Sequence, residues 1–357
     1  MEFRALTARR IGAQMISPQN DGAAGETLLR LGAIQAQDYG MAKWALALRS
    51  RGATLASVNA AIDGGEILRT HALRHTWHFV AARDIYWLLD LSGPVEVARR
   101  NYRLKQLELD VATLRKAARV MEKSLGGNDF LTREELLDAI RGSGIATDGN
   151  RAAHMLGWAE LEQILTSGPS LGGGRTHALL QKRVPKARRM TREESLAELA
   201  GRYFRSRGPA TVRDFSWWSG LTLRDAQRGL ESVRKSLDAE PGDAEALWFD
   251  GKLRPARGNG VYLLPAFDEF LIAYSDRSAQ LRSADQKTLI SNNGIFWPIV
   301  VSDGAVVGTW RKVTKRAKVS VQVKIFRGAP RPPEARLAAA VARVEKFFDA
   351  RPAAGSA

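Results

Sequence analysis

The chain has 357 residues, of which 45% are hydrophobic, so it is long enough for two or three domains with cores of their own. This composition excludes an intrinsically disordered protein. Lys and Arg outnumber Asp and Glu by 54 to 38, which gives a formal net charge of +16 at pH 7. Such a charge favours a polyanionic partner, although a genome rich in G and C would also encode many arginines.

Cysteine is absent, which excludes disulfides, a thiolate nucleophile and a metal centre ligated by cysteine. The first four residues contain no apolar signal core, and no apolar run reaches the roughly 18 residues that a membrane span needs. We therefore expect a cytoplasmic protein, associated with the nucleoid if its polyanionic partner is DNA.

The first hundred residues fit a helical unit that also contains a strand pair. Hydrophobic periodicity predicts helices over 7–16, 24–31 and 41–49, strands within 67–80, and a closing helix over 82–91.

The middle of the chain shows the same order of elements twice, three helices and then a strand pair, at a spacing of roughly 80 residues. In the first copy, the first helix is predicted over 111–125 and the third over 150–166. The second helix is predicted to begin at the capping box formed by Thr132 and Glu135. Two short strands are predicted within 169–185, around a glycine-rich turn that resembles a wing.

The second copy begins at another capping box, Thr191 with Glu194, and its first helix runs to about Arg207. Shorter helices are predicted over 211–219 and 222–235, followed by a strand pair within 237–249. The third helix of such a unit usually enters the major groove. Neither third helix carries the dense face of Arg, Asn and Gln that base reading requires, so contacts to phosphate are the more natural expectation.

After residue 254 the pattern changes to alternating and β-branched residues, which is typical of strands. The predicted elements are strands over 260–264, 295–302, 306–311 and 319–326, a hairpin turn at Ser302-Asp303-Gly304, a helix over 335–348, and a disordered tail over 351–357.

Two glutamines separated by one small residue, Gln35 and Gln37, stand between two helical patterns. In an extended chain, side chains alternate faces, so both amides would point the same way and Ile34 and Ala36 the other way. In a continuous helix the two amides would diverge by about 200°. The pair can act together only where the helix is broken, and its structural alternative is a polar turn whose amides cap backbone groups.

Several stretches of the chain resemble the AlkZ-like family of bacterial winged-helix DNA glycosylases. They are LGAIQAQ (31–37), RHTWHFV (74–80), GPATVRDFSWWSGL (208–221), LLPAFDEF (263–270) and VGTWR (307–311), and the resemblance covers about residues 4–327. It implies an α+β, mainly helical fold, in which three tandem winged-helix units and a C-terminal β-rich part form a C-shaped scaffold. The implied divisions are 1–100, 101–187 and 188–254 for the winged-helix units, 255–328 for the β-rich part, and 329–357 for a terminal helix and tail.

The resemblance also implies an activity, the hydrolysis of the N-glycosidic bond of N-alkylated purines in duplex DNA, in some members including interstrand crosslinks. Gln35 and Gln37 would be the catalytic residues of a monofunctional glycosylase in base excision repair. A sister branch carries Asp at the second position, and this chain follows the double-glutamine pattern. The expected protein is a monomer that binds double-stranded DNA with an alkylated purine and uses no cofactor and no metal.

The residue types fit this chemistry independently of the family. Most glycoside hydrolysis uses a carboxylate to stabilise an oxocarbenium-like transition state. A neutral amide orients water and offers only a dipole, so it suits substrates with a good leaving group. A purine alkylated at N7 or N3 is already cationic and departs as a neutral base.

Three further residues are candidates for lining the site: Asp38, Arg74 and His78. Asp38 would add a negative charge, although an extended chain would turn it away from the glutamines. His78 and Arg74 lie in a stretch that resembles the family, and either can equally be a structural polar residue beside Trp77. His71, with His75 and His78, also suggests a metal ligand set, but on a strand His71 and His75 would share one face while His78 takes the opposite one, and no nearby Asp or Glu completes the set.

Basic residues supply the candidate DNA contacts, which are Lys43, Arg69, Arg175, Arg311, Lys312, Lys315 and Arg316. The last four follow a predicted hairpin, where lysines can also serve to protect a solvated sheet edge. Trp217, Trp218, Phe267 and Phe270 are interpreted as core residues rather than base-stacking platforms. The alternative function is a non-catalytic winged-helix DNA-binding protein or transcriptional regulator, for which the fold and a basic surface would suffice.

Overall fold

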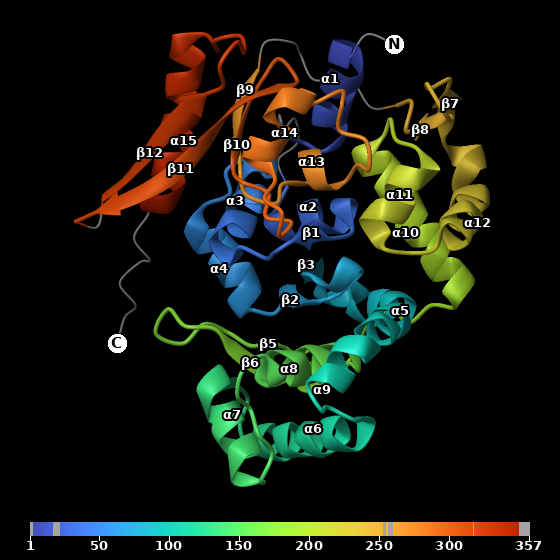
Figure 1. Cartoon of the computed structure of the whole chain (residues 1–357), viewed down its shortest axis with the longest axis vertical. Coiled ribbons are helices and arrows are strands. Elements are labelled where there is room, and N and C mark those ends of the chain that lie inside the picture. The colour runs from blue at the N-terminus through green and yellow to red at the C-terminus, as the bar shows by residue number, and fades with distance from the viewer. Residues whose placement is uncertain (1–2, 17–21, 253–254, 256–259, 317, 350–357) are drawn as a thin grey trace. The chain divides into compact units, whose positions relative to one another are not determined.

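The structure is a computed structural model of an α+β protein, and it describes residues 3–16, 22–252, 255, 260–316 and 318–349 (Figure 1). Contacts divide the chain into two compact units. One consists of Met1–Asn59 together with Leu196–Ala357, and the other consists of Ala60–Ser195. Helix α4 (Leu55–Asp63) and helix α10 (Arg192–Arg207) cross the two boundaries in the sequence. No helix in the described part of the chain combines the length and the apolar character that a membrane crossing requires.

The unit formed by Ala60–Ser195 begins with an antiparallel pair of strands, β2 (Ile67–His71) and β3 (Trp77–Ala81). A 3-10 turn, η1 (Leu73–His75), joins them, and η2 (Ala82–Asp84) leads into the long helix α5 (Ile85–Gln106). The predicted strands within 67–80 are thereby confirmed as a hairpin. The helix predicted over 82–91 extends further, to Gln106.

The rest of this unit has the order helix, strand, helix, helix, strand, strand. Its elements are α6 (Val111–Gly126), β4 (Leu131–Thr132), α7 (Arg133–Gly142), α8 (Arg151–Leu161), β5 (Leu165–Ser167), β6 (Thr176–Leu179) and the short α9 (Leu180–Arg183). The three strands form one sheet in the order β4-β6-β5. Buried leucines, alanines and methionines from α6, α7 and α8 form a single core beneath it. The capping box of Thr132 and Glu135 opens α7, as its sequence predicted.

One predicted helix of this unit is wrong at its C-terminal end. The helix predicted over 150–166 stops at Leu161, and the last residues of that range belong to strand β5. The backbone of Gln163 has a φ of 62°, a left-handed conformation that no α-helix continues through. Leu165 is completely buried in the strand, so tertiary packing decides its conformation. Strand β6 pairs with β5. Of these two strands, only β6 lies within the range 169–185, where both strands of the pair were predicted.

The other unit contains the N-terminal helices α1 (Phe3–Ala13), α2 (Ala24–Leu31) and α3 (Tyr39–Arg49), with the two-residue strand β1 (Ile34–Gln35) between α2 and α3. The helix predicted over 24–31 is confirmed with the same bounds. The N-terminal helix begins and ends earlier than its predicted range of 7–16.

A second group of helices in this unit follows α10. It consists of α11 (Val212–Ser219), α12 (Leu223–Val233) and η3 (Arg234–Ser236), and then the strand pair β7 (Asp238–Glu240) and β8 (Leu247–Phe249). Tyr203, Phe204, Phe215 and Trp218 pack their rings together, with centroids 5.1 to 5.6 Å apart. Trp218 is fully buried, whereas Trp217 is 46% exposed, because neighbouring residues on a helix face different directions. The interpretation of Trp217 as a core residue is therefore wrong.

The C-terminal part is an antiparallel four-stranded sheet with the order β12-β11-β10-β9. Its elements are β9 (Val261–Leu264), α13 (Glu269–Ile272), α14 (Ser283–Leu289), β10 (Ile299–Ser302), β11 (Ala305–Lys315), β12 (Lys318–Ile325) and α15 (Glu334–Asp349). Strand β10 begins four residues later than predicted, and β11 runs beyond the predicted range 306–311 to Lys315. The predicted disordered tail, 351–357, lies outside the described residues.

Helix α15 packs against β9 and β12 and protects the free edge of the sheet. The carboxylate of Asp349 accepts a hydrogen bond from the backbone N–H of Val319 at 2.6 Å, and that of Glu345 accepts one from Val321 at 2.9 Å. Unpaired edge N–H groups are a template for pairing with another chain. In this sheet, two carboxylates accept hydrogen bonds from such N–H groups of β12. Lysines are therefore not the only residues that protect this edge.

A buried ion pair fixes β2 against α8 in the unit formed by Ala60–Ser195. Glu160 accepts hydrogen bonds from the backbone N–H of His71 at 2.9 Å and from its ring Nδ1 at 2.5 Å. Burial alone would raise the pKa of Glu160, but the charge of His71 and its hydrogen bonds outweigh burial and hold the pKa at about 2. The ionised carboxylate is therefore a structural component of this unit.

We predict that Glu160→Gln removes part of the acid sensitivity of folding. The pKa of Glu160 is depressed in the folded state, so its contribution is complete above the ordinary value of 4.5 and is lost as the pH falls towards about 2. The difference in unfolding free energy between wild type and E160Q should shrink by about 3 kcal/mol across that range. Urea unfolding at a series of pH values measures it, and E162Q, which changes an exposed neighbour, should keep the wild-type slope. An E160Q profile parallel to wild type would contradict the assignment.

The predicted hairpin turn at Ser302-Asp303-Gly304 is confirmed, with φ values of 51° at Asp303 and 84° at Gly304. A Cβ atom on Gly304 would also overlap the side chain of Thr7. We predict that Gly304→Ala lowers the unfolding free energy by more than the roughly 1 kcal/mol expected from a left-handed alanine alone. The matched control is Gly294→Ala, which has a φ of 73° and no atom within 4 Å of an added Cβ. Equal losses in the two variants would rule out the contact with Thr7 as a cause.

Candidate active site

The segment that carries Gln35 and Gln37 lies between two helices, as its sequence predicted. Helix α2 ends at Leu31, and Gly32 follows with a φ of 78°, while its N–H donates to the carbonyl of Leu28. A side chain at Gly32 would be strained in that conformation. Helix α3 begins at Tyr39, where the carboxylate of Asp38 accepts a hydrogen bond from the N–H of Met41 at 3.0 Å. A helix C-terminus and an N-cap therefore define both ends of the segment.

The residues of the segment alternate in chemistry and differ in exposure. Ile34 is 1% exposed and Ala36 is fully buried, so the apolar residues face the core. Gln35, in strand β1, is 7% exposed, whereas Gln37 is an exposed residue in a bend. One carboxamide is therefore in contact with solvent and the other is nearly enclosed. The common direction of the two amides stays a prediction.

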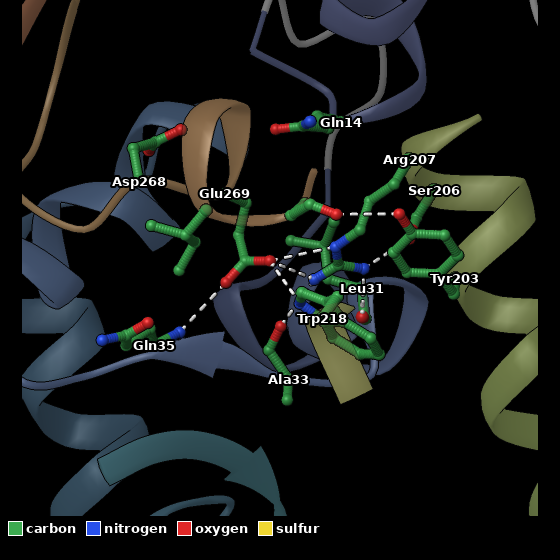
Figure 2. A network of polar contacts seen from close by, with 12 residues as sticks. Gln14, Leu31, Ala33, Gln35, Tyr203, Ser206, Arg207, Trp218, Asp268 and Glu269 are labelled. Carbon is green, nitrogen blue, oxygen red and sulfur yellow. Dashed lines mark hydrogen bonds and ion pairs between the residues drawn. The ribbon is translucent and has the colours of Figure 1, made fainter. Parts of the chain in front are cut away.

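Arg207, the last residue of α10, holds the start of this segment. Its side chain is fully buried, and its two terminal nitrogens donate to the carbonyl of Leu31 at 2.7 Å and to that of Ala33 at 2.8 Å (Figure 2). The carbonyl of Leu31 belongs to the last turn of α2, so no N–H group of that helix is available to bond it. An arginine is suited to this position because its planar fork donates in several directions at once.

Glu269 completes the arrangement from the first turn of α13. Its Oε2 atom forms an ion pair with Arg207 at 2.7 Å and accepts a hydrogen bond from the indole N–H of Trp218 at 2.8 Å. Its Oε1 atom accepts a hydrogen bond from the backbone N–H of Gln35 at 3.1 Å. Figure 2 shows the carboxylate between Gln35 on one side and Arg207 with Trp218 on the other. The backbone of a candidate catalytic residue is thus bonded directly to a buried charge.

The residue before Glu269 forms a second buried ion pair. Asp268 contacts Arg49 at 2.8 Å, with side chains that are 1% and 0% exposed. Arg49 also donates to the carbonyl of Gln14 at 3.0 Å, and Asp268 caps α13 through the N–H of Phe270. The backbone around Arg207 is further held by Tyr274, whose hydroxyl donates to the Arg207 carbonyl at 2.7 Å. Burial, against the opposing charge of Arg10, raises the pKa of Tyr274 to about 12, so it donates as a neutral phenol.

The three predicted site-lining residues have different surroundings. Asp38 is exposed and serves as the N-cap of α3. Arg74 lies in the turn between β2 and β3 with a φ of 52°, and His78 in β3 is fully buried, with its Nδ1 atom 2.9 Å from the carbonyl oxygen of Thr76. A place for Arg74 and His78 at the active site stays a prediction.

The seven predicted DNA contacts fall into two groups by exposure. Lys43 is 9% exposed, with its Nζ atom 2.6 Å from the side-chain oxygen of Asn59, and Arg69 is 8% exposed and lies over the ring of Trp77 at 4.2 Å. Both side chains are thus engaged within the protein. The exposed residues are Arg175, Arg311, Lys312, Lys315 and Arg316. Of the last four, Arg311, Lys312 and Lys315 lie in β11, and Arg316 lies in the turn that follows it, a place that a large ligand can reach.

His71 and His78 lie in β2 and β3, and within the described ranges no group of three or more His, Cys, Asp or Glu is arranged so that it could hold a metal ion.

Sequence reasoning missed the two buried ion pairs. A signal was present, because Asp268 and Glu269 are consecutive carboxylates within the apolar stretch LLPAFDEF. Acidic residues at positions that hydrophobic neighbours carry into a core are rarely unpaired. Buried partners for both carboxylates were therefore to be expected, but their identity depends on contacts more than 60 residues away along the chain.

Comparisons with known proteins identify the family and the fold of the chain. The family model described as DNA glycosylase AlkZ-like matches residues 28–347. An interstrand DNA cross-link repair glycosylase of Streptomyces sahachiroi is 24% identical over 339 residues, which cover 89% of this chain and 90% of that protein. The structure of the DNA glycosylase AlkZ of Streptomyces sahachiroi has the same fold, with a TM-score of 0.81 at 20% identity over 98% of this chain and 97% of that one. Because the family model spans most of the sequence, including the Gln35–Gln37 segment and the residues that hold it, the chain belongs to the AlkZ-like family of DNA glycosylases, and the prediction of a hydrolase acting on DNA is confirmed at the level of the family.

Proposed function

We propose that this protein hydrolyses the N-glycosidic bond of an N-alkylated, cationic purine in double-stranded DNA, with Gln35 and Gln37 as its catalytic residues. The observation that carries the proposal is the fixed backbone of the Gln35–Gln37 segment in a chain of the AlkZ-like family, with the amide of Gln37 open to solvent.

The proposed reaction matches what carboxamides can do. An amide oxygen accepts a hydrogen bond from water and an amide N–H donates one, so the pair can place a water molecule at the anomeric carbon. Neither amide carries the formal negative charge that stabilises a sugar cation in most glycoside hydrolases. The cationic base supplies the missing driving force, because it departs as a neutral molecule and needs no strong general acid. We therefore propose alkylation at N7 or N3 of a purine as the substrate class.

Bulky and crosslinked lesions are included in the proposed substrate range. The relative from Streptomyces sahachiroi is named for interstrand cross-link repair, and it aligns with nearly the whole of this chain. A crosslinked base cannot be rotated freely out of the duplex, so full base flipping is not part of the proposed mechanism.

The proposed DNA-binding architecture is three winged-helix units and a β-rich part. The order α6, β4, α7, α8, β5, β6, with its three-stranded sheet, supports one such unit, and α10, α11 and α12 with the β7–β8 pair support another. The unit over 1–100, the bounds of the five predicted divisions and the C-shaped scaffold stay predictions. We further propose a monomer that acts on chromosomal DNA in the cytoplasm.

We predict that Gln37→Ala lowers turnover strongly but leaves duplex binding intact. Loss of one positioned group that acts only in the transition state costs about 10²–10³-fold in kcat. Purified protein would be incubated with a duplex that contains one N7-alkylguanine, and abasic sites would be counted. The matched control is Q286A, which alters an exposed glutamine in α14.

Three lesions are tested in that assay: a methyl adduct, a bulky adduct and a crosslink. Absence of abasic sites from wild-type protein with all three, together with a preferred sequence on undamaged DNA, would favour the non-catalytic regulator instead. Equal turnover in wild type and Q37A would remove Gln37 from the reaction.

We predict that the exposed basic residues at the β11–β12 turn contribute to DNA affinity by binding phosphates. Replacing Lys315 and Arg316 by alanine should weaken duplex binding at low salt and reduce the slope of log K against log salt by roughly 0.9 for each phosphate that the variant no longer neutralises. Binding would be measured by fluorescence anisotropy over a salt series. Lys287→Ala, an exposed change on α14, serves as the control. A slope unchanged by the double substitution would assign these residues to the solvated surface.

A further inference from the structure

We infer that Glu269 and Arg207 form a positioning pair for the catalytic segment, a role that rests on the proposed function of Gln35 and Gln37. Three backbone atoms of the segment are held by this pair: the carbonyls of Leu31 and Ala33 by Arg207, and the N–H of Gln35 by Glu269. Together they set the direction in which the Gln35 side chain leaves the backbone.

The geometry resembles the pairing of two strands. In an extended chain, the backbone groups of residues two apart point to the same edge, where a neighbouring strand would bond them. The carbonyl of Ala33 and the N–H of Gln35 are such groups, and they meet a guanidinium donor at 2.8 Å and a carboxylate acceptor at 3.1 Å. Two side chains therefore take the place of a strand on this edge of β1. The remaining carbonyl, of Leu31, anchors the same edge to the end of α2.

The pair is rigid because its own hydrogen-bonding groups are used. A guanidinium has five N–H groups. Those of Arg207 donate to Glu269 from Nε and Nη2, to the carbonyls of the segment, and to the hydroxyl of Ser206 at 2.8 Å. Trp218 fixes the same carboxylate oxygen with its indole N–H. Both charged side chains are fully buried, so water does not compete for these contacts.

The neighbouring pair shows what a purely structural role looks like. Arg49 and Asp268 are equally buried, and Asp268 directly precedes Glu269 at the start of α13. Their partners are the carbonyls of Gln14 and Ala45 and the N–H of Phe270. Within the described part of the chain, the hydrogen bonds of Arg49 and Asp268 reach no atom of residues 31–37. Both pairs should therefore contribute to stability, but only Glu269 with Arg207 should affect the catalytic geometry.

The experiment compares Glu269→Gln with Asp268→Asn in the full-length protein. Both remove one buried negative charge from an arginine, so both should lower the unfolding free energy. E269Q should lower kcat on N7-alkylguanine DNA by about 10–100-fold at nearly unchanged KM, because small misplacements of a catalytic group have effects of that order. D268N, measured at a temperature where both variants are folded, should keep kcat within roughly 3-fold of wild type.

A second readout does not depend on activity. Amide hydrogen exchange, followed by mass spectrometry, should show faster exchange over residues 33–37 in E269Q and not in D268N, because only E269Q weakens the acceptor of the Gln35 N–H. Unchanged exchange there in E269Q would overturn the inference. A wild-type protein without glycosylase activity would instead refute the proposed function and leave this test standing.

A conservative variant covers the case in which E269Q does not fold. Arg207→Lys keeps a positive charge against Glu269 but replaces the planar fork by a compact ammonium, whose three N–H groups cannot make all five hydrogen bonds of the guanidinium. It should raise exchange over residues 33–37 and lower kcat at least ~10-fold. Wild-type kcat and exchange in R207K would overturn the inference.

Discussion

The buried contact between Arg207 and Glu269 is the interaction on which the candidate active site depends. Removing two charges from water is costly, and hydrophobic residues of similar volume often stabilise a fold as well or better. A buried ion pair is therefore weak support for a role in stability alone. What distinguishes this pair is its partners, which are the carbonyl of Leu31 at the end of α2, the carbonyl of Ala33 and the N–H of Gln35. Each of these backbone groups lies where helix α2 ends or has already ended.

The position of the two carboxylates explains how distant parts of one unit converge. Asp268 and Glu269 are adjacent in the chain, and they accept from arginines at the ends of two different helices, α3 and α10. A short segment after β9 thus ties the N-terminal helices to the helices around Trp218. A loop held only by hydrophobic contacts could shift by small steps, whereas charge-assisted hydrogen bonds require defined distances and directions.

Sequence patterns predicted local structure well and long-range contacts poorly. The helix bounds 24–31, the capping boxes at Thr132 and Thr191 and the turn at Asp303 follow from chemistry within a few residues, and the structure confirms them. The helix predicted over 150–166 was too long, because a buried Leu165 in β5 prevails over helical periodicity. The Gln35–Gln37 segment was recognisable from its residue types. Its support by Arg207 was not, because their spacing along the chain exceeds any local pattern.

The exposure of the two glutamines supports a division of tasks in the proposed reaction. Gln35 is 7% exposed and its backbone is fixed by a buried carboxylate, whereas Gln37 is exposed two residues later. Water must reach the anomeric carbon from solvent, so the exposed amide is the one suited to orient it. An enclosed amide keeps a single orientation and offers a fixed dipole to the developing sugar cation. Two neutral groups held in this way can serve a substrate that already carries its positive charge, and they would be poor catalysts for an unmodified purine.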